Sequence, residues 1–149
     1  MIRLLAVLLL AACGGGFFEP SDQRALDEAQ NRWDTSGITN YTFDYRHSCF
    51  CADGGRLVRI QVESDLVVSV EPADNQGPLA DENLLAWPTV DTLFSHIASL
   101  SNSDSFDGYK FEATYDPTVG YPISIELTAP PNIADAGSAE QVSNFEPLD

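Results

Sequence analysis

The sequence predicts an α+β domain: an antiparallel β-sheet of about five to six strands with two amphipathic helices packed on one face. Short segments in which apolar and polar residues alternate recur along the chain, as they do in half-buried strands. Turn residues at positions 53–55 and 64–65 join three of these segments closely, which favours antiparallel hairpins. Two other segments carry apolar residues at helical spacing, and one face of such a sheet can bury both helices.

The first helix is expected over residues 21–33, with Ser21 as its N-cap and Gly37 at its end. Its apolar residues share one face because they recur at i, i+3 and i+7: Leu26, Ala29 and Trp33. The second helix is expected over residues 89–100, with Thr89 as its cap. Its apolar stripe consists of Val90, Leu93, Phe94, Ile97 and Leu100.

The strands are predicted from the period-two alternation, which is clearest in the first of them. The predicted segments are residues 41–51, 57–63, 66–71, 110–115, 121–128 and, as a last edge strand, 141–146. Residues 72–88 are polar and interrupted by prolines, which indicates a loop. Residues 116–120, D-P-T-V-G, are typical of the turn of a hairpin.

The charge of the chain limits its partners. Acidic residues outnumber basic ones by 23 to 7, so the formal net charge is −16. Phosphate groups would be repelled, and we therefore expect neither nucleic-acid binding nor attraction to an anionic membrane surface. The length is that of one domain with a substantial core.

The first residues are typical of an exported lipoprotein. Arg3 precedes a run of Leu, Ala and Val that has about half of the ~20 residues needed to span a bilayer, so a cleaved signal is predicted rather than a membrane helix. The segment L-A-A-C at residues 10–13 resembles a bacterial lipobox, and this resemblance implies cleavage before Cys13 and diacylation of that cysteine. The predicted signal peptide, lipidated tether and single α+β domain are residues 1–12, 13–20 and 21–149.

Cys49 and Cys51 lie one residue apart in the first predicted strand. Thiols of exported chains are oxidised, and with Cys13 lipidated these two can pair only with each other or between molecules. Residues i and i+2 of a strand have Cα atoms ~6.6 Å apart, close to the ~6.8 Å limit for a disulfide, so a bend beside residues 53–55 is expected. The closed loop is small and contributes little chain-entropy stabilisation. A structural disulfide is favoured, and a redox-active pair is an alternative.

His47 supports a third interpretation. His47, Cys49 and Cys51 occupy positions i, i+2 and i+4 on one face of the predicted strand, and an imidazole with two thiolates suits Zn²⁺ or Cu⁺. A fourth ligand is not visible nearby, since His96 lies on the polar side of the second helix and is expected to face solvent. Taken alone, His47 is expected to be a hydrogen-bonded strand residue.

Other clusters lack the spacing of known sites. Residues 102–108 resemble a calcium loop faintly, but Phe106 occupies a ligand position. Asp74, Asp81 and Glu82 are expected to be charged loop residues, with a cation site as the alternative. The sequence has no serine in a nucleophile-elbow motif. We therefore predict no catalytic residue and no cofactor.

Four motifs stand out along the chain: Trp33, Y-T-F-D-Y at residues 41–45, C-F-C at residues 49–51 and Y-D-P-T-V-G-Y-P at residues 115–122. Together they resemble an uncharacterised family of bacterial secreted proteins and lipoproteins, a domain of unknown function. The resemblance covers most of residues 25–148. It implies the fold and an exported location, and it implies no activity. Members tend to have Asp-Gly where this chain has Ser64 and Asp65.

These observations predict a bacterial lipoprotein anchored in the cell envelope and facing away from the cytoplasm. In a Gram-negative cell the location would be the outer membrane or periplasm. Its expected role is a non-enzymatic module that binds an envelope protein or a small ligand, because the sheet offers a face and edges to a partner. The alternatives are a thiol redox protein or sensor that uses Cys49 and Cys51, and a metal-binding protein that uses these cysteines with His47.

Overall fold

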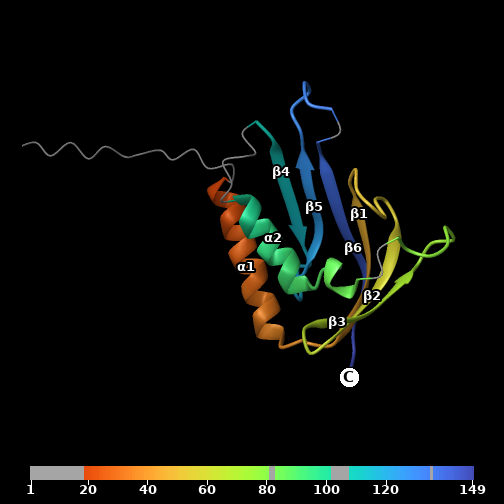
Figure 1. Cartoon of the computed structure of the whole chain (residues 1–149). Helices are drawn as coiled ribbons and strands as arrows, with labels where there is room; N and C mark the ends of the chain where they lie inside the picture. The colour runs from red at the N-terminus through yellow and green to blue at the C-terminus, as the bar shows by residue number, and fades with distance from the viewer. Residues whose placement is uncertain (1–18, 81–82, 102–107, 135) are drawn as a thin grey trace, which may run out of the picture.

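The computed structural model describes residues 19–80, 83–101, 108–134 and 136–149 (Figure 1). The helices within them are α1 (Pro20–Ser36) and α2 (Val90–Ser101), and a short 3₁₀ helix, η1 (Leu84–Ala86), precedes α2. The strands are β1 (Tyr41–Ser48), β2 (Leu57–Glu63), β3 (Leu66–Pro72), β4 (Lys110–Tyr115), β5 (Pro122–Thr128) and β6 (Ser138–Pro147).

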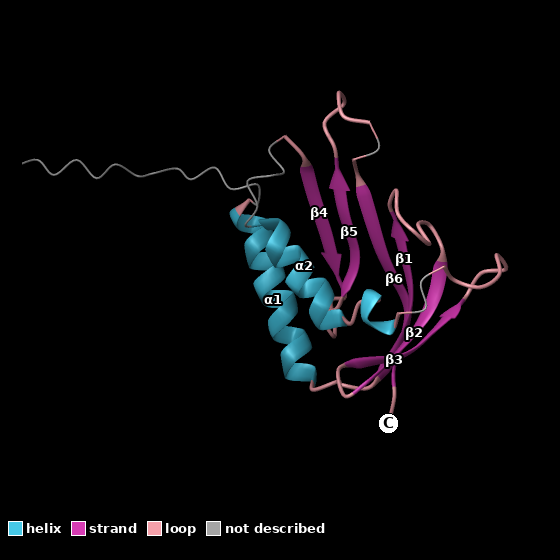
Figure 2. Ribbon diagram, in the orientation of Figure 1, coloured by secondary structure: helices cyan, strands magenta, loops and turns pink. Residues whose placement is uncertain are grey.

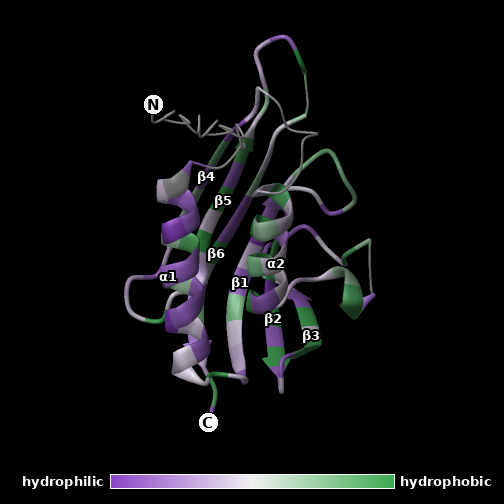
Figure 3. Ribbon diagram, turned by 90° about the vertical axis from the view of Figure 1, so that its left-hand side faces the viewer, coloured by the Kyte–Doolittle hydropathy of each residue, from purple (hydrophilic) through white to green (hydrophobic). Residues whose placement is uncertain are grey.

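The strands form one antiparallel sheet in the order β3-β2-β1-β6-β5-β4, with both α-helices against the same face (Figure 1, Figure 2). The predicted α+β class is therefore confirmed. The outward surface of α1 is strongly hydrophilic (Figure 3), as expected for a helix that buries only one face. Among the described residues, no helix is both long and apolar enough to cross a membrane.

The start of α1 differs from the prediction. Ser21 lies inside the first turn, and the N-cap is Glu19, whose backbone N–H donates to the Asp22 carboxylate at 3.3 Å. Glu19 at the N-cap and Asp22 three residues later thus form a capping box, and Ser21 is not the cap. The other end agrees with the prediction, since α1 runs to Ser36 and Gly37 follows in the left-handed conformation, with φ at 65°.

The start of α2 was predicted correctly, because the Thr89 Oγ1 accepts a hydrogen bond from the Thr92 N–H at 3.2 Å. The position of the last strand was predicted wrongly. The sequence predicts an edge strand over residues 141–146, whereas β6 is longer and lies between β1 and β5, inside the sheet. Its pairing with β1 joins residues about a hundred positions apart, and no local pattern reports such a partner.

The core lies between the helices and the sheet and contains a cluster of aromatic rings. Tyr41 is fully buried, with its ring centroid 5.3 Å from those of both Trp33 and Phe145. Polar atoms of these rings join the elements: Trp33 donates to the Asp91 carboxylate at 3.2 Å, and the Tyr41 hydroxyl accepts from the Val90 N–H at 3.0 Å. The aromatic cluster therefore fixes both helices on the sheet.

Gly120, in the turn between β4 and β5, allows that turn to pack against α1. Its φ is 100°, a conformation that favours glycine. A Cβ at this position would overlap the carbonyl oxygen of Ala29 and approach Arg32 Cβ and Trp33 N to 3.0 Å. The glycine of the Y-D-P-T-V-G-Y-P motif is thus required by a backbone contact with the helix.

We predict that Gly120→Ala lowers the free energy of unfolding by about 3 kcal/mol or more, because backbone overlap adds to the strain of the positive φ. Gly77→Ala is the matched control: its φ is 86°, but nothing lies within 4 Å of the added Cβ. The control should lose only about 1–2 kcal/mol. Urea unfolding followed by tryptophan fluorescence measures both, and equal losses would contradict the packing argument.

Candidate functional site

The two neighbouring cysteines lie in a tight turn after β1. The prediction that this strand continues to Cys51 is wrong, because the Gly55 N–H donates to the His47 carbonyl at 2.8 Å and folds the chain back. A Cβ at Gly54 would overlap the Cys49 carbonyl oxygen, so the turn also depends on that glycine. The chain reversal brings the Cα atoms of Cys49 and Cys51 to 5.3 Å, inside the range of about 4.4–6.8 Å seen in disulfides, and their sulfurs are paired.

His47 lies beside this pair, as the sequence spacing predicts. The ligand-capable atoms of His47, Cys49 and Cys51 all lie within 4.8 Å of one another. Reduced, this group has the donor types that Zn²⁺ and Cu⁺ prefer; with the sulfurs bonded to each other, it has no thiolate to offer. Phe50, between the cysteines, is 95% exposed.

On the same face of the sheet, the buried carboxylate of Glu140 has three polar neighbours, Tyr45, His47 and His96. Glu140 is 4% exposed and stands directly opposite His47 in the β1–β6 ladder. The Tyr45 hydroxyl donates to Glu140 Oε2 at 2.7 Å, and His96 Nδ1 donates to Glu140 Oε1 at 2.8 Å. His96 is 41% exposed but contacts Glu140, so the expectation that it simply faces solvent is wrong. The structure thus brings together both histidines of the chain.

The electrostatics of this group follow from its burial and hydrogen bonds. Burial raises the pKa of Glu140, but hydrogen bonds from His96 and Tyr45 outweigh that effect and leave this pKa below its ordinary value. The bond to Glu140 raises the pKa of His96, even though burial opposes it. Burial and the Glu140 charge raise the pKa of the Tyr45 hydroxyl. The ionised carboxylate is therefore the favoured form of Glu140 in the fold.

Two adjoining cavities open beside this network. They share Tyr45, His47, Ala86 and Trp87 in their walls. The larger, of about 300 Å³, is completed by Leu85, Pro88, Thr92, Leu93, His96 and Glu140. The smaller, of about 160 Å³, is completed by Cys51, Ala52 and Asp53. We call the two together the histidine pocket. Its walls come from β1, the cysteine turn, the segment around η1, α2 and β6.

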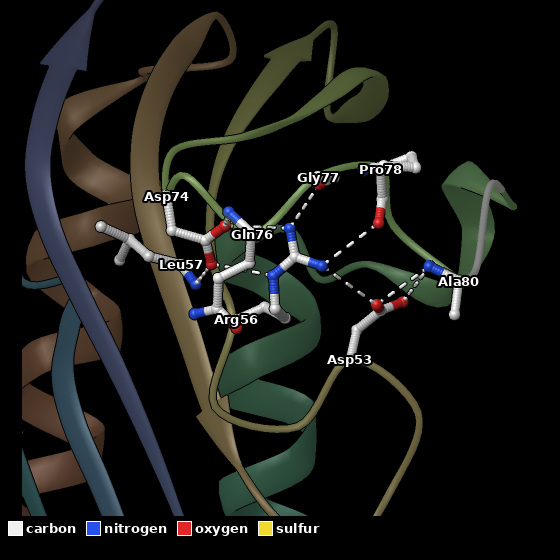
Figure 4. Close-up of polar contacts among 8 residues, drawn as sticks. All are labelled: Asp53, Arg56, Leu57, Asp74, Gln76, Gly77, Pro78 and Ala80. Atoms are coloured by element: carbon white, nitrogen blue, oxygen red, sulfur yellow. Dashed lines mark hydrogen bonds and ion pairs between the residues drawn. The ribbon is translucent and has the colours of Figure 1, made fainter.

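A half-buried arginine, Arg56, holds the loop after β3 against the cysteine turn (Figure 4). Arg56 donates two hydrogen bonds to the Asp74 carboxylate, at 2.8 and 2.9 Å. It also donates to the carbonyls of Gly77 at 2.7 Å and Pro78 at 3.2 Å. In the same loop, the Ala80 N–H donates to the Asp53 carboxylate at 2.9 Å. These contacts fix the loop that continues into the wall formed by η1.

This arrangement settles the role of Asp74, which was expected to be a charged loop residue, with a cation site as the alternative. Hydrogen bonds from Arg56 lower the pKa of Asp74 to about 2, so the Asp74 carboxylate is engaged by the arginine. The other two residues of that prediction, Asp81 and Glu82, lie outside the described residues. So do the predicted lipidation residue Cys13 and all but the last residue of the loop at 102–108.

One family model matches residues 25–147, a range that contains the cysteine turn, the Gly120 turn and the aromatic core. The chain belongs to the Family of unknown function (DUF6174). No curated protein and no solved structure gave a match. The predicted membership of an uncharacterised family is therefore confirmed, while bacterial origin and export remain predictions. The DUF6174 domain, and not the terminal segment before it, contains every residue of the histidine pocket.

Several residues of this pocket were not identified from the sequence. Glu140 precedes the predicted strand 141–146, although Glu140 and Val142 alternate with exposed residues and thus share the buried face. Trp87 belongs to a segment that the sequence marks only as a loop. Arg56, which does not line the pocket but holds the neighbouring loop, lies between a predicted turn and a predicted strand. The alternation around Glu140 could have predicted that this side chain is buried. Its contact with His96 could not be predicted, because it depends on pairing between distant segments.

We predict that the His96–Glu140 pair stabilises the fold most at acidic pH. A raised pKa in the folded state means that this contribution is complete below the ordinary histidine pKa of about 6.5 and is lost as pH rises through the folded value. An NMR titration of the imidazole should give a pKa above ~6.5 in wild type. Glu140→Gln should lower it, whereas Glu126→Gln, an exposed carboxylate on β5, should not. An unchanged His96 pKa in Glu140→Gln would refute the assignment.

Proposed function

We propose that this chain is a bacterial envelope lipoprotein whose DUF6174 domain binds a small ligand in the histidine pocket without transforming it. The observation that carries the proposal is the composition of the larger cavity. Its volume of about 300 Å³ is at the lower end of the range for small-molecule sites. Aromatic and aliphatic side chains form most of its wall, and a few polar groups converge on it. Such a wall is typical of ligand pockets.

The polar groups favour a specific kind of ligand. Each carboxylate oxygen of Glu140 accepts one hydrogen bond, from Tyr45 or from His96, so Glu140 orients the His96 ring. With Nδ1 donating to Glu140, the remaining ring nitrogen of His96 is left to interact with the contents of the pocket. Together with Trp87 and Leu93, this arrangement suits a small, partly apolar molecule that carries a hydrogen-bonding group.

The pocket is also held in shape before any ligand binds. Arg56 attaches the loop after β3 to the cysteine turn, and Glu140 attaches β6 to α2. Pre-organisation of this kind reduces the ordering cost of binding. The proposed module therefore requires no large rearrangement to accept its ligand.

The proposal is tested by incubating the purified full-length protein with a small-molecule extract of bacterial envelopes and identifying the retained compounds by mass spectrometry. Ala86 lies in the wall of both cavities and is exposed, so Ala86→Trp should fill the pocket and reduce retention at least about tenfold, equivalent to ~1.4 kcal/mol. Ser143→Trp, in a cavity on the other sheet face, is the control and should retain as wild type does. Retention by wild type no greater than by Ala86→Trp would overturn the proposal.

Anchoring is part of the same proposal and is supported by the lipobox-like segment at residues 10–13. Two acyl chains on Cys13 would give stable attachment, since each buried CH₂ contributes about 0.8 kcal/mol and one chain alone holds a protein only marginally. Residues 14–20 would let the domain stand at most ~25 Å from the acyl boundary. With a net charge of −16, no electrostatic attraction to anionic lipid is expected to assist.

We predict that wild type fractionates with membranes and is released by detergent but not by salt. Cys13→Ser should remain unprocessed and carry no fatty-acid label, because the modified thiol is missing. Cys49→Ser, which changes a thiol within the domain, should be labelled like wild type. Labelled Cys13→Ser protein of mature size would exclude the lipoprotein interpretation.

A further inference from the structure

We propose that Cys49 and Cys51 form a thiol–disulfide exchange centre that takes electrons from a dithiol segment of another protein, with Cys51 as the sulfur attacked. This inference goes beyond ligand binding and does not depend on it. It rests on three features of the cysteine turn: the access to each sulfur, the position of His47 and the cavity beside Cys51.

Access differs between the two sulfurs. Cys51 is an exposed residue, whereas Cys49 is half-buried. An incoming thiolate must approach in line with the S–S bond, from the side opposite the leaving sulfur. Attack on the sulfur of the exposed Cys51 is therefore favoured. The bond closes a loop with a sequence separation of two, the kind of loop for which chain-entropy stabilisation is smallest. The fold therefore gains little stability from the bond, which leaves it available for chemistry.

His47 is placed to assist the leaving sulfur. One of its ring nitrogens lies within 4.8 Å of both sulfurs. Its strand position is fixed by the β1–β6 ladder, where Glu140 stands directly opposite. A neighbouring imidazole N–H stabilises a thiolate, and a stabilised thiolate leaves faster. The half-buried Cys49 is the sulfur that must leave when Cys51 is attacked.

The exchange proceeds in two balanced steps. A substrate thiolate attacks Cys51 Sγ; the bond to Cys49 breaks, and Cys49 takes the electron pair and accepts a hydrogen bond or proton from His47. The second substrate thiol, as thiolate, then attacks the substrate sulfur of this mixed disulfide, and Cys51 leaves with the electron pair. The substrate dithiol has become a disulfide, and Cys49 and Cys51 have received its two electrons. The two protons that the substrate thiols released to solvent on ionisation return from solvent, one to Cys51 and one to Cys49 or to His47 if His47 has protonated Cys49.

The surroundings of Cys51 indicate the class of substrate. The cavity of about 160 Å³ beside it can take one side chain next to the reacting cysteine of the substrate. Phe50, 95% exposed, offers an apolar contact on the turn itself. Asp53 in the cavity wall and the net charge of −16 disfavour acidic segments. The predicted substrate is a neutral or basic peptide segment with two cysteines.

The test uses purified full-length protein and a basic synthetic peptide of C-x-x-C type. The reduced peptide should reduce the Cys49–Cys51 bond of the folded protein, as followed by acid quench, thiol alkylation and mass spectrometry. His47→Gln should slow this at least about tenfold, a modest share of the ~10²–10⁴ that a positioned proton donor contributes. Arg46→Gln, which changes an exposed residue on the other face of β1, should react at the wild-type rate. Circular dichroism confirms that each variant is folded.

A trapping experiment tests the assignment of the sulfurs independently. Offered the oxidised peptide, Cys49→Ser should form a mixed disulfide through Cys51, and Cys51→Ser should form much less. Equal trapping by the two variants, a bond reduced only when the fold is lost, or an unaffected rate in His47→Gln would each overturn the proposal. A reduced protein that retains one Zn²⁺ and no longer exchanges would overturn it in favour of metal binding. Retention of compounds is measured on wild type and Ala86→Trp, so failure of exchange and failure of ligand binding are distinguishable.

Discussion

The pairing of β1 with β6 is the constraint on which the rest of the structure depends. It joins β3-β2-β1 to β6-β5-β4, so that two three-stranded halves become one sheet with a continuous buried face. It also places Glu140 opposite His47 and within reach of the Tyr45 hydroxyl. A buried carboxylate is costly unless it is hydrogen-bonded, and here Tyr45 and His96 supply those bonds. The same pairing that completes the core therefore creates the polar centre of the histidine pocket.

Arg56 holds the loop after β3 by polar contacts, in addition to the packing of Leu79 against the core. A guanidinium offers five donors in a rigid plane, and Arg56 uses them on the Asp74 carboxylate and on backbone carbonyls of the loop. The neighbouring Asp53 accepts from the Ala80 N–H, which joins the cysteine turn to the loop at a second point. One wall of the pocket thus depends on a charged contact between two irregular segments.

Much of the fold could be predicted because it is encoded in local periodicity. Alternation located the strands, helical spacing located α1 and α2, and the Thr89 cap agrees with the structure. The errors lie where a partner distant in sequence, or a backbone turn, decides. Strand β1 stops at Ser48 because Gly55 bonds back to His47, and β6 is central because it pairs on both sides. The grouping of His47 with the cysteines was predictable from spacing; the contact of His96 with Glu140 was not.

The sequence by itself determined the helix faces and the proximity of His47, Cys49 and Cys51, because each depends on residues within a few positions of one another. It also determined the α+β class and the family membership, because these follow from local patterns and motifs repeated along the chain. Only the tertiary structure decided which side chains surround the pocket. His96, Glu140 and the residues around Trp87 come from three separate segments, and their meeting depends on strand order and helix packing. Local patterns specify which face of an element is buried; they do not specify what it is buried against.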